Sequence, residues 1–251
     1  MIKFNKEDIF VVSGGSSGFG KAICMKLNSL GATVIAIARN EEKLNQVKLE
    51  SEFPDNIFTV SKDLSDLDSI PLLIKDMVKN FGKLKGFVHS AGIIDIMPLK
   101  GIRIHKIKEM FDVNFFAGLA LAKGFSDRRV ARENAALVFL SSAVSICGQP
   151  GMIQYTSTKG AINSMVKSMA LELSKTGIRA NSVLPAHIKT EMADLYDEVY
   201  SKEYKQELET MYPLGPGEPE DVANLVIFLL SDASRWITGQ NIIIDGGRTL
   251  I

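Results

Sequence analysis

The stretch IFVVSGGSSGFG, at residues 9–20, decides the fold of this 251-residue chain. Its first four residues are a continuous apolar run, which is typical of a buried parallel strand. Glycines and serines follow, and then an apolar period that stops at Gly31 predicts a helix. In such a unit the glycines let the backbone approach a diphosphate, and the helix N-terminus favours its charge. The stretch therefore predicts a dinucleotide site, the alternative being a glycine turn that holds no ligand.

Six further apolar runs predict the other strands of a sheet. They lie at residues 33–38, 57–61, 86–89, 137–140, 179–184 and 241–245, with helical patterns between most of them. Alternating strands and helices indicate an α/β fold with a doubly wound parallel sheet and helices on both faces. We therefore expect one domain over residues 1–251, built on a seven-stranded Rossmann-type sheet. The polar segment at about 191–217 is interpreted as a lid over the substrate.

Charge and cysteine content argue against several kinds of partner. The chain has 29 basic and 29 acidic residues, so no net field favours nucleic acid or a membrane surface. Cys24 and Cys147 have no metal-ligand spacing, so we expect reduced thiols and no metal. No apolar run is long enough to span a bilayer or to act as a secretory signal. These features favour a cytoplasmic protein that acts on a small molecule.

The end of the second predicted strand favours NADP(H) over NAD(H), although NAD(H) remains possible. An acidic residue there would bind the ribose 2′-hydroxyl of NAD, whereas the sequence has Arg39 and Asn40. A guanidinium can bind a 2′-phosphate through two parallel hydrogen bonds. The alternative is a solvated arginine that opens the next helix, and Ser17 supplies no second positive charge. After the third strand, Asp63 either contacts the adenine amino group or caps the following helix.

Small and polar residues follow two more strands. Ser90, Ala91 and Gly92 come after the fourth strand, where small side chains let a cofactor pass close to the backbone. Ser141 and Ser142 come after the fifth strand. Because the carboxyl ends of parallel strands share one edge of the sheet, we expect these hydroxyls to face the same crevice as the glycine turn.

Tyr155 and Lys159 are candidate proton-transfer residues. An apolar stripe through residues 161–173 predicts a helix, on which the two side chains share one face. A nearby ammonium favours the phenolate, and would lower the tyrosine pKa from ~10 by about one to three units. That shift would bring Tyr155 into the range of acid–base catalysis at neutral pH. The alternative is a surface tyrosine beside a solvated lysine.

Taken together, these motifs resemble the short-chain dehydrogenase/reductase family over the whole chain. The resemblance is strongest to members of similar length, which include 3-oxoacyl-carrier-protein reductases and many sugar, steroid and polyol dehydrogenases. The motifs are Gly14-x-x-x-Gly18-x-Gly20, Asn114, Ser142 thirteen residues before Tyr155, Lys159, residues 185–190, and ITGQNIIIDGG at residues 237–247. The resemblance implies an oxidoreductase that interconverts a carbonyl and a secondary alcohol by hydride transfer.

The resemblance also implies a role for each catalytic position. Tyr155 would protonate the carbonyl oxygen, and Ser142 would hold and polarise it. Lys159 would lower the Tyr155 pKa and bind the nicotinamide ribose. Asn114 would anchor a water that links Lys159 to solvent. The cofactor-binding set comprises Ser13, Gly14, Ser16, Ser17, Gly18, Phe19, Gly20, Arg39, Asn40, Asp63, Leu64, Ser90, Ala91, Gly92, Tyr155, Lys159, Pro185, Ile188 and Thr190.

The sequence departs from the usual pattern of the family in four places. Ser13 replaces a threonine, Phe19 a smaller aliphatic residue and Ala186 a glycine. His89 and Ser90 replace two asparagines, and we expect a ring nitrogen of His89 to supply the brace that an amide would otherwise give. Phe19 is expected to narrow the site near the diphosphate.

Several alternatives remain open at this point. The chain is either the enzyme described, a non-catalytic dinucleotide sensor, or a member that modifies sugar nucleotides. Its substrate is an acyl thioester, a keto-sugar, a steroid or a small ketone. Lys189, Lys202 and Lys205 are interpreted as a solvated face rather than as an anion site. Members of this length imply a homotetramer, or else a homodimer, and the apolar end at residues 249–251 fits burial against a neighbouring subunit.

Overall fold

The computed structural model describes residues 2–188, 190–191, 201 and 210–250. Its strands are β1 Ile9–Ser13, β2 Thr33–Ala38, β3 Ile57–Ser61, β4 Leu84–His89, β5 Ala131–Leu140, β6 Arg179–Pro185 and β7 Asn241–Ile244. They form one seven-stranded sheet in the order β3-β2-β1-β4-β5-β6-β7, and every neighbouring pair is parallel. The strand order reverses between β1 and β4, which confirms the predicted doubly wound sheet.

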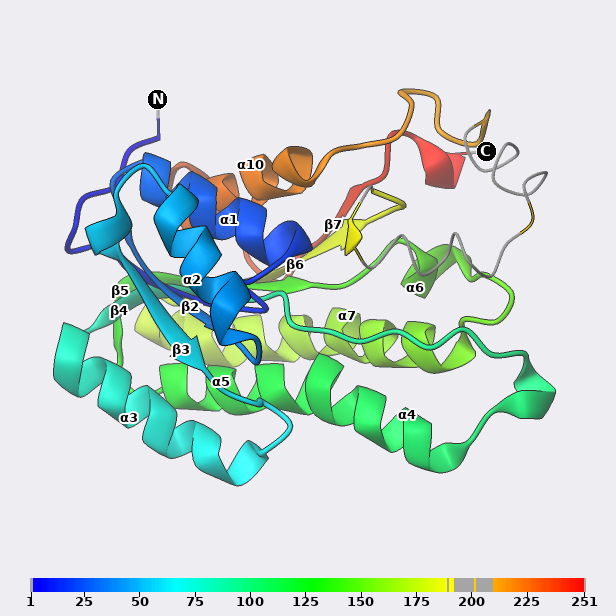
Figure 1. Cartoon of the computed structure of the whole chain (residues 1–251), viewed down its shortest axis with the longest axis horizontal. Coiled ribbons are helices and arrows are strands. Elements are labelled where there is room, and N and C mark those ends of the chain that lie inside the picture. The colour runs from blue at the N-terminus through cyan, green and yellow to red at the C-terminus, as the bar shows by residue number, and fades with distance from the viewer. Residues whose placement is uncertain (1, 189, 192–200, 202–209, 251) are drawn as a thin grey trace.

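Helices cover both faces of this sheet (Figure 1). The described helices are α1 Gly18–Ser29, α2 Glu41–Glu50, α3 Ile70–Phe81, α4 Ile104–Phe111, α5 Ala117–Phe125, α6 Val144–Cys147, α7 Ile153–Leu173 and α10 Pro219–Leu230. Helices α1, α2 and α10 lie on one face, and α3, α4, α5 and α7 lie on the other (Figure 1). A π-helical turn, Asp112–Phe116, joins α4 to α5.

The buried strands supply side chains to two cores. In β1, Ile9 and Val11 pack with the buried residues of α3, α5 and α7, whereas Phe10 and Val12 pack with those of α1 and α10. Successive side chains of a strand point to opposite faces, so a strand that is covered on both sides is apolar at every position. This is why the predicted strands appear in the sequence as continuous apolar runs.

Strand boundaries differ from the predictions mainly in β5. This strand begins at Ala131, whereas the sequence predicted a start at Leu137. The prediction missed the first residues because several of them carry polar side chains. Glu133 and Asn134 are exposed, and Asn134 has a φ of 61°, so this part of the strand lacks the apolar pattern of a covered strand. The paired strand β4 also begins earlier than predicted, at Leu84.

The predicted lid lies mostly outside the described residues, as do Lys189, Lys202 and Lys205. Of the predicted segment, residues 191, 201 and 210–217 are described. Gly217 forms a parallel bridge with Ile188, which brings the two ends of the segment together. None of the described helices is both long and apolar enough to cross a bilayer. Within the described ranges, no group of three or more His, Cys, Asp and Glu side chains could hold a metal ion.

Candidate functional site

Two cavities adjoin each other at the edge of the sheet where the strands end. The first, of about 330 Å³, lies over the ends of β1, β2 and β4. The second, of about 90 Å³, lies over the ends of β5 and β6. Phe19 and Thr190 line both cavities, so the two cavities share a wall. Phe19 therefore occupies the boundary between the two cavities.

The first cavity gathers most of the predicted cofactor residues. Those that line it are Gly14, Ser16, Ser17, Gly18, Phe19, Arg39, Asn40, Asp63, Leu64, Ser90, Ala91, Gly92 and Thr190. Ser13 and Gly20 are buried beside it, and Tyr155, Pro185 and Ile188 line the second cavity instead. Ile37, Ala38, Lys43, Lys62, Ile93, Val113 and Glu191 also line the first cavity and were not predicted.

The glycine turn brings backbone against backbone. Gly14 has a φ of 71°, and a Cβ there would lie 2.7 Å from the Ala91 nitrogen. A Cβ on Gly20 would lie 2.0 Å from the Gly14 carbonyl oxygen. Only glycine therefore lets α1 start so close to the turn. The Ser17 side chain does not cap α1, which leaves the first-turn N–H groups to bind an anion.

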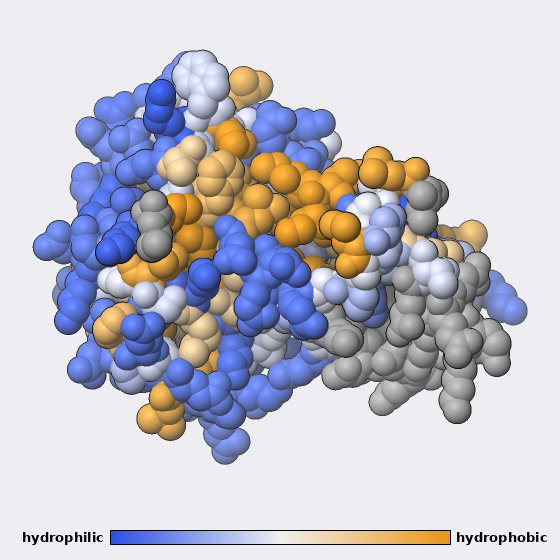
Figure 2. Space-filling view, turned by 90° about the horizontal axis from the view of Figure 1, so that it is seen from above, coloured by the Kyte–Doolittle hydropathy of each residue, from blue (hydrophilic) through white to orange (hydrophobic). Residues whose placement is uncertain are grey.

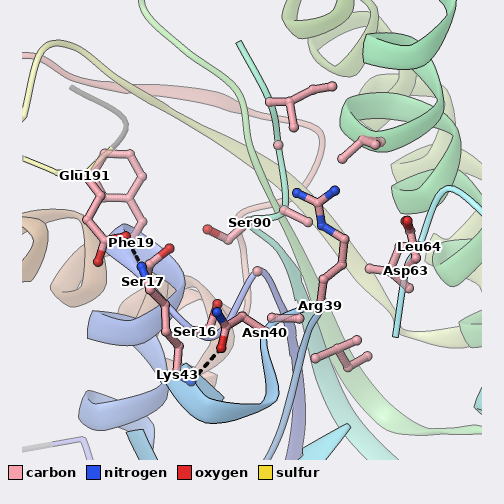
Figure 3. Close-up of a pocket in the computed structure, with 18 of the residues that line it drawn as sticks. Ser16, Ser17, Phe19, Arg39, Asn40, Lys43, Asp63, Leu64, Ser90 and Glu191 are labelled. Carbon is pink, nitrogen blue, oxygen red and sulfur yellow. Dashed lines mark hydrogen bonds and ion pairs between the residues drawn. The ribbon is translucent and has the colours of Figure 1, made fainter. Parts of the chain in front are cut away.

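Two cations, Arg39 and Lys43, line the first cavity (Figure 3). Arg39 points into the first cavity between Ser90 and Leu64. Lys43 Nζ lies 2.7 Å from Glu191 Oε2, and both side chains are largely exposed. Exposed ion pairs of this kind contribute only about 0–1 kcal/mol, so a phosphate can compete for the ammonium. The structure thus supplies the second positive charge that the sequence was not expected to provide.

The local sequence explains where Lys43 lies. Asn40 is the N-cap of α2, and its Oδ1 accepts a hydrogen bond of 2.9 Å from the Lys43 nitrogen. Lys43 is therefore on the first turn of α2, next to Arg39. The pairing of an N-cap asparagine with a lysine three residues later was the signal that could have revealed it.

Asp63 stabilises a turn rather than a helix. Its Oδ1 accepts hydrogen bonds of 2.9 Å from the nitrogen and from the hydroxyl of Ser65. These bonds hold the pKa of Asp63 below its usual value. The following helix α3 begins only at Ile70, so the predicted helix cap is wrong, and the carboxylate lines the first cavity.

His89 forms the predicted brace, at the point where the strand order reverses. Ser13 of β1 and His89 of β4 are register partners. The Ser13 hydroxyl lies 2.9 Å from His89 Nδ1, and His89 Nε2 lies 3.1 Å from the Asn114 carbonyl oxygen. The Ala91 nitrogen also donates to Ser13 Oγ at 3.3 Å. A single chain of hydrogen bonds thus connects the glycine turn after β1 and the loop after β4 to the π-helical turn that carries Asn114.

The hydrogen bonds define the tautomer of His89. Burial, together with the nearby charge of Lys159, lowers the pKa of His89 to about 3, so the ring is neutral. A carbonyl oxygen only accepts, so Nε2 carries the proton and Nδ1 accepts from the Ser13 hydroxyl. That hydroxyl is then free to accept from Ala91, and every member of the chain is satisfied.

Asn114 lies in the π-helical turn and connects three segments. Its side chain accepts from the Ile93 nitrogen at 2.8 Å and donates to the Ile93 oxygen at 3.0 Å. It also donates to Thr158 Oγ1 on α7 at 3.1 Å. A π-helical turn changes the local hydrogen-bond pattern, and such turns are frequent at functional sites. The asparagine thereby fixes the loop after β4 against the helix of Tyr155 and Lys159.

Tyr155, Lys159 and Ser142 come together at the second cavity. Lys159 is 4 % exposed and Tyr155 is 8 % exposed. Lys159 Nζ donates to the Leu140 carbonyl at 2.7 Å and lies 5.5 Å from the centre of the Tyr155 ring. Ser142 and Tyr155 line the second cavity, and the Ser142 hydroxyl acts to lower the pKa of Tyr155. A Cβ on Gly92 would lie 3.6 Å from Lys159 Nζ, so the first cavity passes next to the ammonium.

The expected lowering of the Tyr155 pKa is wrong. Burial raises the pKa of Tyr155 to about 12, and the hydrogen bond with Ser142 opposes this only in part. Burial also lowers the pKa of Lys159 to about 8. The ammonium binds a carbonyl of β5, so the loss of hydration outweighs its effect on the phenol. At neutral pH both groups retain their protons.

The second cavity contains side chains that the sequence reasoning missed. Val144, Cys147, Gln149, His187, Tyr212 and Arg248 line it, together with the predicted residues Ser142, Tyr155, Pro185, Ile188 and Thr190. They come from α6, from the loop after β6 and from the segment after β7. No local motif marks them, because they meet only in the folded chain.

Comparison with known proteins gives consistent matches over nearly the whole chain. A family model described as enoyl-(acyl carrier protein) reductase matches residues 14–249. The 3-oxoacyl-[acyl-carrier-protein] reductase FabG of Staphylococcus aureus strain Mu50 is 32% identical over 241 residues, which cover 94% of this chain and 96% of that protein. A short-chain type dehydrogenase/reductase from Mycobacterium ulcerans has a TM-score of 0.91 at 30% identity, with 99% of this chain and 92% of that chain covered.

A structure from Brucella melitensis is also similar. It is described as a short-chain dehydrogenase/reductase, glucose/ribitol dehydrogenase. Its TM-score is 0.89 at 27% identity, and the match covers 98% of this chain and 99% of that chain. The names of these relatives refer to two different kinds of substrate: an oxoacyl group on a carrier protein, and glucose or ribitol.

The contact between His89 and α5 gives a stability prediction. A Cβ on Gly118 would lie 2.6 Å from His89 Cδ2. We expect Gly118→Ala to destabilise the protein by about 1–3 kcal/mol, although Gly→Ala normally stabilises a helix interior. In a His89→Asn background the smaller side chain should remove most of this cost. Urea unfolding of the four proteins of this double-mutant cycle measures the coupling.

Gly160→Ala on α7 is the matched control. A Cβ at that helical position has no neighbour within 4 Å, so this variant should be neutral or slightly stabilising. If Gly118→Ala costs the same with histidine and with asparagine at position 89, the ring does not impose the glycine.

Proposed function

The chain belongs to the short-chain dehydrogenase/reductase family of NAD(P)-dependent oxidoreductases, and we propose that it reduces a ketone with NADPH, using Tyr155 as the general acid. The observation that carries this proposal is the meeting of Ser142 and Tyr155 in the second cavity, with Lys159 beneath them. The adjoining first cavity lies over a glycine turn and a helix N-terminus. Its shape and its backbone donors fit the diphosphate of a dinucleotide.

Each side chain has a distinct part in the reaction. When bound, the nicotinamide supplies the hydride that reduces the carbonyl carbon. Ser142 donates to the carbonyl oxygen and polarises it, and Tyr155 gives its proton to that oxygen as negative charge develops. The Lys159 ammonium stabilises the resulting phenolate and holds the nicotinamide ribose. The reverse reaction, alcohol oxidation, uses the same groups with the proton moving back to Tyr155.

The proton that Tyr155 loses must be replaced. Asn114 is completely buried, and His89 uses one lone pair of its carbonyl oxygen. A carbonyl oxygen has two lone pairs, so the second can bind a water beside Lys159. We propose that this water connects the lysine to solvent.

The charges of the first cavity support a preference for NADP(H), with NAD(H) as a weaker alternative. Arg39 points into the cavity, and Lys43 lines its rim (Figure 3). Glu191 also lines it, but its carboxylate is paired with Lys43. Strand β2 ends without the carboxylate that would bind the 2′-hydroxyl of NAD.

Two other functions fit the chain less well. A dinucleotide sensor would not need a buried lysine next to a tyrosine and a serine that open into a cavity. A sugar-nucleotide-modifying member of the family would need room for a large substrate, whereas the second cavity measures about 90 Å³. The relatives named 3-oxoacyl-[acyl-carrier-protein] reductase favour a ketone substrate.

NADPH consumption over β-ketoacyl thioesters, keto-sugars, steroids and small ketones tests the proposed activity directly.

Exposed apolar side chains support assembly as a homotetramer, or else as a dimer. Leu119 on α5 borders a groove of about 570 Å³, which is lined mainly by α5 and α7. Strand β7 is an edge of the sheet, and Trp236 before it is 90% exposed. Figure 2 views the molecule from the side of α1 and α10, and shows an apolar band leading toward the C-terminal segment. Two separate apolar surfaces are what a tetramer with two kinds of interface requires.

Tyr155→Phe tests the general acid. The variant keeps the ring packing but has no proton to give, so kcat should fall by about 10²–10⁴-fold. NADPH affinity, followed by fluorescence titration, should stay near that of the wild type because the phenol mainly serves the substrate. Turnover close to wild type would remove Tyr155 from the proposed mechanism.

The pH profile of reduction tests the buried lysine. The active form carries a protonated Lys159, whose pKa is lowered to about 8, so kcat should fall as the pH rises through about 8. Tyr155, with its pKa raised to about 12, and His89, with its pKa lowered to about 3, add no transition near neutral pH. Lys159→Arg keeps its charge and should lose this alkaline fall. A fall that persists in the arginine variant would assign it to another group.

Substitution of the two cations tests cofactor selection. Arg39→Asp should lower the ratio of kcat/KM for NADPH over NADH by about 100-fold, and Lys43→Gln by about 10-fold, since each removes charge-assisted hydrogen bonds to the phosphate. Lys48→Gln on the same helix is the control, because Lys48 does not line the cavity. An unchanged ratio in Arg39→Asp would contradict the proposed reading of the 2′-phosphate.

Light scattering after size-exclusion chromatography tests the assembly. A tetramer of the 27.5 kDa chain is expected. Leu119→Glu and Trp236→Glu should each halve the mass if the two surfaces form different interfaces. Leu49→Glu on α2, where the leucine is also exposed, should leave the mass unchanged. A wild-type monomer would contradict the proposal.

A further inference from the structure

The second cavity contains one strong cation and no carboxylate. Among the described residues that line it, Arg248 is the only lysine or arginine, and none is an aspartate or a glutamate. The other polar groups are hydroxyl, thiol, amide and imidazole side chains, including those of Ser142, Gln149 and Tyr155. The cavity in which we place the substrate carbonyl therefore favours a ligand that carries negative charge.

The guanidinium of Arg248 has no partner in the part of the chain that the structure describes. The two other described arginines that are at least partly buried do have partners: Arg132 Nη1 lies 3.5 Å from Asp8 Oδ1, and Arg179 Nη1 donates to the Leu229 carbonyl at 2.8 Å. Arg248 is half-buried, yet its side chain forms neither an ion pair nor a hydrogen bond with the described residues. A partly buried guanidinium with five unused donors favours an anionic ligand.

The nearest acidic residue in sequence is already engaged. Asp245 Oδ1 accepts from the Gly247 nitrogen at 3.0 Å, and Oδ2 accepts from the Thr249 nitrogen at 2.7 Å. These bonds hold the pKa of Asp245 below its usual value, although burial opposes them. The carboxylate stabilises the turn that presents Arg248 and does not neutralise it.

The turn after β7 fixes the position of Arg248. Gly246 and Gly247 have φ values of 58° and 91°, which other residues rarely adopt. The Leu214 nitrogen donates to the Gly246 carbonyl at 3.1 Å, and a Cβ on Gly247 would lie 3.0 Å from Pro213 Cγ. Arg248 is thus held beside Tyr212, and its positive charge acts to lower the pKa of Tyr212, which burial raises.

We propose that the substrate carries a carboxylate or a phosphate ester close to its ketone, and that Arg248 binds this oxyanion. The inference rests on the proposed function, since it names the substrate class of the same site. A guanidinium pairs with such a group through two parallel hydrogen bonds, which also orients the ketone toward Ser142 and Tyr155.

The size of the cavity limits the distance between ketone and anion. Its volume of about 90 Å³ is small beside the roughly 300–1,000 Å³ of typical ligand pockets. Ser142 and Tyr155 line it together with Arg248, so a short molecule can reach all three. A β-ketoacyl thioester or a sugar has no charge next to the reacting carbon and would leave Arg248 unpaired.

Matched pairs of small ketones test the proposal. Acetoacetate is compared with methyl acetoacetate, and dihydroxyacetone phosphate with dihydroxyacetone, so that each pair differs in charge at one group. The measurements are kcat/KM with NADPH, and the Kd for the enzyme loaded with NADP⁺ by calorimetry. We expect at least one charged ketone to be preferred over its neutral counterpart by tenfold or more. The pair that shows this preference identifies a carboxylate or a phosphate as the anion.

Arg248→Gln should abolish that preference by weakening only the charged ketone, and Arg248→Lys should restore part of it. Arg235→Gln is the matched control, because Arg235 is exposed and does not line the cavity. Equal or better use of the neutral ketones by the wild type overturns the proposal, as does an unchanged preference in Arg248→Gln.

The two measurements separate this inference from the proposed function. Tyr155-dependent reduction of the neutral ketones alone would support the function and overturn the role of Arg248. Arg248-dependent binding of a charged ketone without turnover would support the anion site and count against the function. If neither charged ketone binds, the anion site is overturned.

Discussion

A neutral imidazole at the reversal point of the sheet holds the two halves of the site together. His89 accepts from Ser13 on β1 and donates to Asn114 in the π-helical turn, so it connects the glycine turn with the proton-transfer helix. A proton on Nδ1 would take away the acceptor of the Ser13 hydroxyl and add a second charge near Lys159, so the neutral ring is favoured. Burial enforces this, and Gly118 leaves the necessary space on α5. The geometry of the site therefore depends on one hydrogen-bonded chain inside the core.

Burial also decides the charges of the proton-transfer pair. Removing Lys159 from water lowers its pKa to about 8, while removing Tyr155 raises its pKa to about 12. The two shifts move the pKa values apart and make Lys159 the stronger acid, yet at neutral pH both groups remain protonated. A protonated phenol is the form that can donate to a ketone oxygen. In the reaction that we propose, both groups therefore hold the proton that reduction requires, and the ammonium would stabilise the phenolate once it forms.

Most of the fold could be predicted from the sequence, because every strand covered on both faces is a continuous apolar run. The early part of β5 could not, since Glu133 and Asn134 are exposed there. The glycine turn and the Tyr155 helix were predictable for a similar reason, as each is a local motif. The Tyr155 pKa was predicted wrongly because spacing reveals a neighbouring lysine but not the loss of hydration around both groups. Arg248 was missed because it reaches the second cavity from the distant segment after β7, whereas Lys43 lies close to Arg39 and was open to prediction from the N-cap at Asn40.

Those two cations give the crevice a polarity that the composition conceals. The chain has a formal net charge of zero, yet Lys43 and Arg39 lie at one end of the crevice and Arg248 lines the other. Lys159 is buried next to Tyr155 and Gly92, which line the second and the first cavity respectively. Low-dielectric walls focus such a field, so a dinucleotide phosphate and a small anionic ketone would each be attracted to a separate end. Arg39 and Lys43 both serve the cofactor end, whereas Arg248 is the one lysine or arginine among the described residues that line the substrate end, so an anionic substrate would depend on it alone.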